Sequence, residues 1–282
     1  MVQNDAVSPA DDGLIAPEVG SWTLTKHRLL KLYIDLFATG MKLKWERRVY
    51  IELYAGAGFG RIRNKGNLIY GSPILALTTQ DPFDYYIFCE SNQENLAALK
   101  QCVQRIAPRA KVEYVPGDCN QAVDKICSLI PPFSRDNKVL SLCFVDPYDI
   151  GIKFATVQKI ATRFVDFLVL LALYMDANRN YSNYVSSKSL KVDESLGSAD
   201  WRARWGEAQM KAMPFPKFLA QEYEKRMQSL GYLETPLYKM KEVRSDEKNL
   251  PLYHLALFSR HPTAYEFWDE VLKYSTDQQA LF

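Results

Sequence analysis

The stretch that most constrains this chain runs from Val49 to Gly60 and reads Val-Tyr-Ile-Glu-Leu-Tyr-Ala-Gly-Ala-Gly-Phe-Gly. A run of β-forming residues ends at the acidic Glu52, and glycines then alternate at Gly56, Gly58 and Gly60. Because glycine has no side chain, such a loop brings bare backbone close to a ligand. The pattern predicts a parallel strand that runs into a ligand-binding loop.

Composition narrows the class of protein. The 282 residues are 48% hydrophobic and 24% charged, which suits one large globular domain. The net charge of +2 does not predict a nucleic-acid coat or an acidic tail. The five cysteines form no CxxC pair and are odd in number, which argues against a disulfide framework or a zinc site. We therefore expect a cytoplasmic protein in a reducing compartment, without a bound metal.

The first 20 residues are rich in Asp, Ala, Pro and Gly and show no periodicity, so we expect a flexible tail over 1–20. They lack the basic-then-apolar order of a signal peptide. The longest apolar run, Phe167 to Tyr174, is too short for a membrane span, which needs about 20 residues. Residues 21–282 are expected to form one domain that does not associate with a membrane.

Strand and helix patterns alternate after this tail. Strands are predicted at 48–53, 84–89, 111–115, 139–145 and 165–173, and helices at 21–44, 73–80, 92–105, 120–129 and 154–164. A helical insertion follows at about 178–231, then strands at 238–243 and 252–258 and a last helix at 263–274. The order predicts a doubly wound α/β fold: a mostly parallel seven-stranded sheet with a C-terminal antiparallel hairpin.

A basic segment separates the glycines from the next helix. Helix signals begin only at Gly71-Ser72-Pro73, with serine as the expected N-cap and proline at the first helical position. The intervening residues 59–70 carry Arg61 and Arg63. A plain surface loop and a flap that meets an anionic group both fit this segment. We predict the flap, as one wall of a substrate site.

Polar residues follow the next three predicted strands. Glu90 ends the second, Asp118-Cys119-Asn120 follows the third, and Asp146-Pro147-Tyr148 follows the fourth. The carboxyl ends of parallel strands meet at one edge of the sheet, where ligands bind. A carboxylate after the second strand is the expected partner for ribose hydroxyls. The sequence therefore predicts a nucleotide site at this edge.

This layout resembles the S-adenosylmethionine-dependent methyltransferases of the Rossmann-like class (class I). The resemblance implies that the glycines approach the methionine part of the cofactor and that Glu90 accepts from both ribose hydroxyls. It also implies that Asp118 accepts from the adenine amino group and that Cys119 packs on the ring. The implied cofactor-binding residues are Glu52, Tyr54, Gly56, Gly58, Glu90, Ser91, Asp118, Cys119, Asn120 and Asp146.

The segment Asp146-Pro147-Tyr148 resembles the Asp-Pro-Pro-Tyr type of motif in methyltransferases that act on amino groups. In that motif a carboxylate and a backbone carbonyl hold the target amino group, and an aromatic ring stacks on its base. The resemblance implies that Asp146, Pro147 and Tyr148 are the catalytic residues. Only one proline is present, and this departure weakens the extension to a nucleobase.

A closer resemblance covers the chain from about Val19 to Trp268. The short motifs that carry it are Gly20-Ser21-Trp22, Lys26-His27, Glu52-Leu53-Tyr54-Ala55-Gly56, Gly71-Ser72-Pro73, Asp146-Pro147-Tyr148, Asn178-Arg179-Asn180, Pro251-Leu252-Tyr253 and Phe267-Trp268. In this joint order they are similar to the three-Cys-motif partner (TcmP) family. That family resembles methyltransferases and is associated with a separate three-cysteine protein, which is the partner the resemblance implies.

The TcmP resemblance also bears on the cations. Spacing alone favours a solvated first helical turn for Lys26 and His27, whereas the shared motif favours a role in the cleft. The same holds for Arg179. With the flap residues and the Gly-Ser-Pro motif, the predicted substrate-binding residues are Lys26, His27, Arg61, Arg63, Ser72 and Arg179.

Three functions remain open. The preferred one is a methyltransferase that acts on nitrogen or oxygen of a polar substrate, a class that includes the amino groups of nucleic acid. The second is a binding module that keeps the nucleotide site without turnover and serves the partner protein. The third is a nicotinamide dinucleotide enzyme, since alternating glycines and Glu90 also suit that cofactor. The terminal hairpin, the Asp146-Pro147-Tyr148 edge and the absence of a helix directly after the glycines count against the third.

Overall fold

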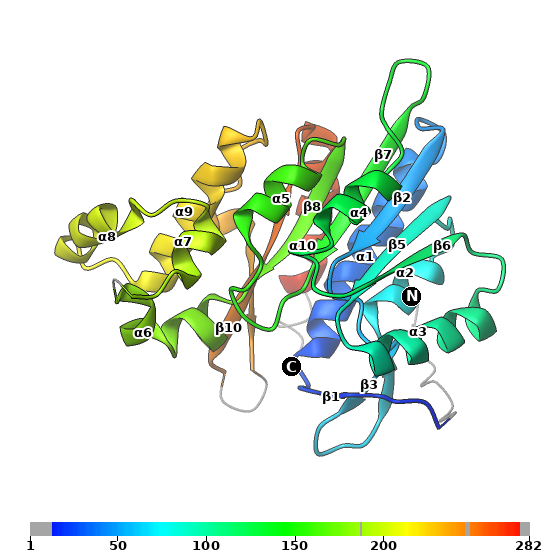
Figure 1. The fold of residues 1–282 in the computed structure, drawn as a ribbon, viewed down its shortest axis with the longest axis horizontal. Helices are drawn as coiled ribbons and strands as arrows, with labels where there is room; N and C mark the ends of the chain where they lie inside the picture. Colours follow the sequence, from blue (N-terminus) through cyan, green and yellow to red (C-terminus); the bar gives the residue numbers. More distant parts are fainter. Residues whose placement is uncertain (1–12, 187, 246–248, 277–282) are drawn as a thin grey trace.

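The computed structural model describes residues 13–186, 188–245 and 249–276. Its centre is a seven-stranded sheet with helices on both faces (Figure 1). The strand order is β6-β5-β2-β7-β8-β10-β9. The first five strands are parallel, and β10 pairs antiparallel with both β8 and β9. This confirms the predicted α/β fold with its C-terminal antiparallel hairpin.

The strands lie close to their predicted positions. They are β2 (Arg47–Glu52), β5 (Tyr85–Glu90), β6 (Val112–Pro116), β7 (Val139–Val145), β8 (Val165–Leu171), β9 (Lys241–Arg244) and β10 (Pro251–Phe258). Every residue of β7 and β8 is buried, as expected of parallel strands covered on both faces. A larger shift occurs at β9, where residues predicted as strand form a 3-10 helix, Leu237–Lys239.

The helices form two layers. One face carries α1 (Thr23–Met41), α2 (Ser72–Leu77), α3 (Gln93–Ile106) and α10 (Pro262–Thr276). The other carries α4 (Val123–Leu129), α5 (Phe154–Ile160), α6 (Tyr181–Val185), α7 (Lys191–Leu196), α8 (Trp201–Met210) and α9 (Phe215–Ser229). Alternate residues of one strand reach the two layers: Val49 and Ile51 pack on the second, and Tyr50 packs on the first.

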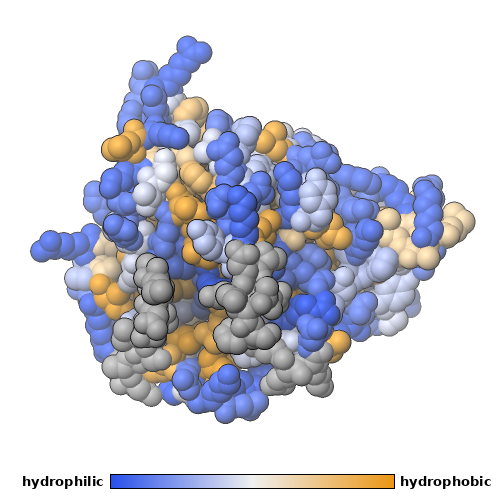
Figure 2. All heavy atoms as spheres, turned by 180° about the vertical axis from the view of Figure 1, so that it is seen from behind, coloured by the Kyte–Doolittle hydropathy of each residue, from blue (hydrophilic) through white to orange (hydrophobic). Residues whose placement is uncertain are grey.

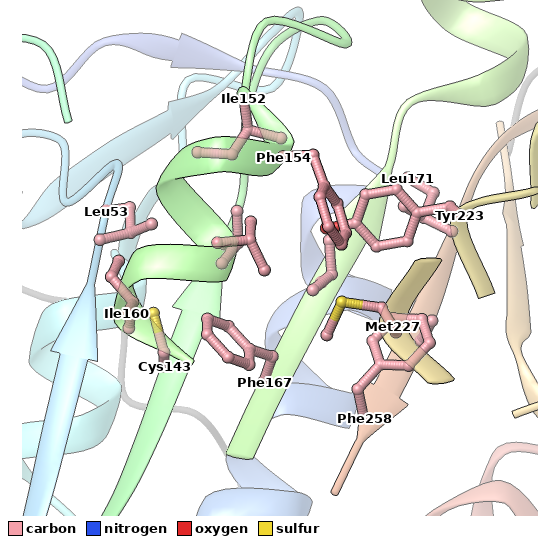
Figure 3. Packing of buried hydrophobic residues seen from close by; sticks show 14 of the residues in the cluster. Leu53, Cys143, Ile152, Phe154, Ile160, Phe167, Leu171, Tyr223, Met227 and Phe258 are labelled. Atoms are coloured by element: carbon pink, nitrogen blue, oxygen red, sulfur yellow. The ribbon is translucent and has the colours of Figure 1, made fainter. Parts of the chain in front are cut away.

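Each layer has its own apolar core. In the second layer Phe154 of α5 and Met227 of α9 pack toward Phe167 and Phe258 of the sheet (Figure 3). In the first layer Tyr33 of α1 meets Trp268 of α10 edge-on, at 5.8 Å between ring centroids. The outer side of the molecule seen from behind is mostly hydrophilic, with hydrophobic residues in smaller groups (Figure 2). Within the described ranges, no helix has both the length and the apolar character needed to cross a bilayer.

The segment after β8 has an uncommon backbone conformation that the sequence patterns do not predict. Leu173–Asn178 forms a π-helix, a rare conformation that occurs mostly as a single turn. Asp176 is buried inside it and accepts hydrogen bonds from the backbone N–H of Ile150 (2.8 Å) and from the Tyr184 hydroxyl (2.8 Å). These tertiary contacts explain why a polar stretch is ordered. The helices α6 to α8 follow, at one end of the sheet (Figure 1).

A second, small sheet involves the predicted flap and the predicted tail. Residues 59–70, predicted as a flap, form a β-hairpin of β3 (Phe59–Ile62) and β4 (Leu68–Tyr70). The left-handed backbone of Asn64 and Gly66 makes its turn. The predicted tail also extends too far, because Glu18–Val19 forms strand β1 and pairs in parallel with β3. Residues 1–12 of that tail lie outside the described residues.

The start of α2 differs from the expected capping. Its N-cap is Gly71, and the Ser72 hydroxyl instead donates to a carboxylate of β2. Helix α4 begins at Val123 without a side-chain cap. The carboxylate of Asp118 accepts from the backbone N–H of Asn120 (2.7 Å) and so stabilises the turn before this helix.

Candidate functional site

A cleft of about 490 Å³ lies at the carboxyl ends of β2, β5, β6 and β7. The first turn of α1 and the small sheet form its outer wall. It brings together most of the predicted site residues: Lys26, His27, Tyr54, Gly56, Gly58, Arg63, Ser72, Glu90, Ser91, Asp118, Cys119, Asp146, Pro147, Tyr148 and Arg179. Glu52, Arg61 and Asn120 do not line it. Across the described residues, no cluster of His, Cys, Asp and Glu could hold a metal ion.

Gly56 and Gly58 are each required in the loop for a different physical reason. Both have left-handed backbone, with φ of 65° at Gly56 and 87° at Gly58. A Cβ at Gly56 would meet no atom within 4 Å, so this position leaves open space beside the backbone. A Cβ at Gly58 would lie 3.1 Å from the Cβ of Cys102 on α3. Gly56 therefore presents bare backbone, while Gly58 lets the loop pack closely against a helix.

The carboxylate of Glu90 is fixed by two backbone donors. Its Oε2 accepts from the N–H of Gly56 at 2.7 Å, and its Oε1 accepts from the N–H of Asn92 at 2.8 Å. The residue is only 9% exposed, yet it lines the cleft. Each carboxylate oxygen can accept more than one hydrogen bond, so both retain capacity for a ligand donor. This geometry suits a pair of neighbouring hydroxyl groups.

The loop after β6, next to Glu90, contributes one apolar and one acidic side chain to the cleft. Cys119 is buried, and burial raises the pKa of its thiol to about 11, so it remains a neutral packing surface. Asp118 is exposed and keeps one carboxylate oxygen clear of the turn contacts described above. Asn120 points elsewhere: its Oδ1 accepts from the N–H of Lys153 and the hydroxyl of Thr156. Asn120 therefore ties the loop to α5 and does not line the cleft.

Glu52 lies beneath the cleft surface. It is completely buried and accepts from the Ser72 hydroxyl at 2.5 Å and from the Tyr50 hydroxyl at 3.1 Å. Burial raises the pKa of Glu52 well above its usual value, and the nearby carboxylate of Asp146 adds to this effect. Glu52 supports Ser72 from behind, and Ser72 is the side chain that lines the cleft.

An ion pair joins the first turn of α1 to the end of β7. Lys26 donates to Oδ2 of Asp146, although the two residues are 120 positions apart. Their side chains are only 13% and 16% exposed. Beyond Asp146, Pro147 is buried and Tyr148 is 81% exposed. The pair therefore holds the catalytic candidate Asp146 in place, next to a free aromatic ring.

His27 lines the cleft as a neutral group. Burial and, to a smaller extent, the positive charge of Lys26 together lower its pKa to about 3. At neutral pH the imidazole therefore carries no charge. It can form hydrogen bonds, but the predicted role of holding an anion by charge does not apply to it.

The pKa of His27 predicts a pH-dependent stability. Between pH 6.5 and about 3 the unfolded chain binds a proton at His27 that the folded protein does not, so stability falls as the pH is lowered through this range. The wild type is expected to lose up to ~1.4 kcal/mol per pH unit more than His27→Gln. Urea unfolding of both proteins at several pH values below 6.5 measures this difference. Parallel pH profiles for the two proteins would contradict the prediction.

Of the three predicted arginines, two line the cleft and one lies outside it. Arg63 lines the cleft, with its Nε 3.6 Å from Oε2 of Glu18 in an exposed pair. Arg61 is outside the cleft and donates from Nη1 to the carbonyl of Gly66 at 2.9 Å. Arg179 lines the cleft and is exposed, and no ion pair joins it to another part of the chain that the structure describes. The hairpin therefore brings one of its two predicted arginines to the cleft.

Several residues that line the cleft were not among the predicted site residues. Examples are Glu18, Trp22, Phe59, Met175 and Tyr253. Trp22 and Tyr253 belong to short motifs of the TcmP resemblance, and that was the one signal for them. Glu18 gave no signal, because a two-residue strand has no measurable periodicity.

Several solved structures overlap this fold at low sequence identity. An O-methyltransferase from Bacillus cereus, in complex with S-adenosylhomocysteine, has a TM-score of 0.48 at 12% identity, covering 90% of this chain and 85% of that chain. A protein from Legionella pneumophila has a TM-score of 0.47 at 12% identity, covering 87% and 91%. The M. jannaschii protein TYW2, in complex with S-adenosylmethionine, has a TM-score of 0.39 at 10% identity, covering 86% and 77%.

These are distant likenesses, and the fold of this chain stands on its own strand order. No protein-family model matches the sequence, and no curated protein matches it either.

Proposed function

We propose that this chain is an S-adenosylmethionine-dependent methyltransferase that acts on a polar substrate. The observation that carries the proposal is the fixed carboxylate of Glu90, held by the N–H groups of Gly56 and Asn92 at the carboxyl edge of the sheet. A buried carboxylate with spare acceptor capacity suits the two hydroxyls of a ribose. The open space beside Gly56 suits the methionine part of the same cofactor.

The other residues of this half of the cleft fit the cofactor as well. Asp118 would accept from the adenine amino group, and Cys119 would pack on the ring as a neutral thiol. When bound, S-adenosylmethionine supplies an electrophilic methyl group. The role of the protein is then to place an acceptor in line with that group, which depends more on positioning than on a strong base.

The other half of the cleft, around Asp146 and Tyr148, has side chains that suit a polar methyl acceptor with an anionic part. Lys26 occupies Oδ2 of Asp146, and Oδ1 remains as an acceptor for an amino or hydroxyl group. The exposed ring of Tyr148 offers a stacking surface beside it. Arg63 and Arg179 line the same cleft as positive charges. We propose the amino group of a nucleotide unit as the acceptor class.

A second candidate is a nucleotide-binding module without turnover, as partner of a three-cysteine protein. The specific observation in its favour is the Lys26–Asp146 pair, which neutralises the carboxylate expected to hold the acceptor. The resemblance to the TcmP family supports the same reading. In this case the cleft would bind S-adenosylmethionine and leave its methyl group in place.

Two measurements separate these candidates. Isothermal titration calorimetry tests binding of S-adenosylmethionine to the intact chain. Incubation with the tritiated methyl donor and separate RNA, DNA, protein and small-molecule fractions then tests transfer. Binding with transfer supports the enzyme, and binding without transfer to any fraction supports the module. If S-adenosylmethionine does not bind, both candidate functions are contradicted.

The placement of the two hairpin arginines predicts unequal effects. Arg63→Glu is expected to reduce methyl transfer about tenfold, because it reverses a charge that faces the substrate half of the cleft. Arg61→Glu, two residues earlier and outside the cleft, serves as the matched control and should change transfer less than about twofold. Rates of radiolabel transfer and calorimetric affinity for the cofactor are measured together. Equal losses in the two variants, or a parallel loss of cofactor affinity, would contradict this division.

A further inference from the structure

A second cavity of about 470 Å³ lies at the opposite edge of the sheet. It is lined by residues at the starts of β7 and β8, among them Lys138, Leu140, Phe164 and Asp166. The end of α1 and the start of α10 form its other walls. We call it the amino-edge cavity. Figure 1 shows the loop before β7 at one end of the strands and the small sheet at the other, so this cavity is separate from the cleft.

One wall of the amino-edge cavity consists of stacked aromatic rings. Phe133 and Phe164 stack with centroids 4.6 Å apart and an interplanar angle of 22°. Trp45 lies against both, at 5.5 Å from Phe164 and 5.9 Å from Phe133. Phe133 is 44% exposed, so this wall is open to solvent. Exposed, ordered rings around a cavity of this size are typical of a small-molecule site.

The cavity also collects positive charge. Lys44, Arg135 and Lys138 line it, and none of them forms an ion pair with the residues that the structure describes. Arg260 lines it too, held by the carbonyls of Ala161 (2.9 Å) and Leu230 (3.0 Å).

The carboxyl group among the lining residues is that of Asp166. It is buried, and burial raises its pKa to about 7. Lys44, Arg135, Lys138 and Arg260 outnumber this one carboxyl group, so the lining around the aromatic wall is predominantly cationic.

We propose that the amino-edge cavity binds a small anion with an apolar, ring-bearing body. The rings of Trp45, Phe133 and Phe164 would cover the body, and Lys44, Arg135 and Lys138 would hold the anionic group. Charge complementarity selects this class of ligand: a neutral apolar molecule would leave the cations unpaired, and a hydrophilic anion would leave the rings uncovered. The site does not depend on the proposed methyl transfer, since it shares no residue with the cleft.

Two fluorescent probes test this proposal on the intact chain. The first is 1-anilinonaphthalene-8-sulfonate, an anionic ring compound, and the second is N-phenyl-1-naphthylamine, which has the same rings without the sulfonate. The sulfonate is expected to bind at one saturable site at least ~10-fold more tightly than the neutral amine, because it meets the cations. An equal or tighter affinity for the neutral amine, or no saturable site for the sulfonate, would overturn the proposal.

Variants locate the site. The double variant Lys44→Gln/Lys138→Gln should weaken sulfonate binding ~10-fold, and Phe133→Ala should weaken both probes. Lys217→Gln, an exposed lysine of α9 away from both cavities, is the matched control and should leave the affinity within twofold. All three side chains replaced in the cavity are exposed, so folding is expected to persist, and thermal unfolding checks it. Sulfonate affinity unchanged in the double-lysine variant, or equally reduced in the control, would overturn the proposal.

Discussion

Replacing Glu90 by alanine is expected to weaken S-adenosylmethionine binding by at least ~100-fold in calorimetric titrations. The carboxylate would accept from two ribose hydroxyls, and hydrogen bonds to a charged acceptor contribute about 1.5–3 kcal/mol each. Two such bonds correspond to two or more orders of magnitude in Kd. Glu90→Gln retains the size of the side chain but loses the charge, so we expect an intermediate loss of about tenfold.

The control for this experiment lies four residues further along the chain. Glu94 is an exposed carboxylate in the first turn of α3 and does not line the cleft, so Glu94→Ala should leave the affinity within threefold. Urea unfolding of Glu90→Ala without ligand separates lost binding from lost folding. A Glu90→Ala protein that is folded and binds the cofactor as tightly as the control would contradict the role assigned to this carboxylate.

Removing either partner of the Lys26–Asp146 pair is expected to destabilise the fold by about 2–4 kcal/mol. Both side chains are largely buried, so the remaining charge would lose its partner in a poorly solvated place. The double variant Lys26→Met/Asp146→Ala should lose at least ~1.5 kcal/mol less than the sum of the single changes. Urea unfolding of the four proteins measures this coupling energy.

A solvent-exposed pair in the same chain provides the comparison. Nζ of Lys153 lies 2.8 Å from Oε1 of Glu194, and the two side chains are 46% and 45% exposed. The coupling energy of such an exposed pair is less than about 1 kcal/mol. The same cycle at this pair should therefore give the smaller value. Equal coupling energies at the two pairs would show that Lys26 does not hold Asp146 in the cleft.

The parallel part of the sheet was predictable because each of its signals is local. Val139–Val145 is apolar apart from Ser141, and the structure places β7 on those seven residues. A strand buried on both faces is predominantly apolar, so sequence and structure coincide there. The π-helix over Leu173–Asn178 was missed because buried Asp176 is satisfied by Ile150, which is 26 residues away. No local pattern contains that contact.

The same distinction holds for the candidate site. Glu90 and Asp146 were found because each ends a strand, and strand ends meet at one edge. The pairing of Asp146 with Lys26 spans 120 residues and left no trace in the local sequence. Glu52 has the same strand-end signal as Glu90, yet it faces Tyr50 and Ser72 below the surface. The hairpin over 59–70 was not predicted, although Asn64 and Gly66 lie in a turn between two β-forming runs.

Strand β1 has a consequence for how quickly a ligand can leave the cleft. The chain near Glu18 and Val19 is attached to β3 by the hydrogen bonds from Arg61 N–H to Pro17 and from Arg63 N–H to Val19, each 2.9 Å long. Two such bonds contribute only about 1–3 kcal/mol together, far less than the central sheet. We therefore expect this segment to open more readily than the central sheet. Since Pro17, Glu18 and Val19 line the cleft, we expect such opening to shorten the residence time of a bound ligand.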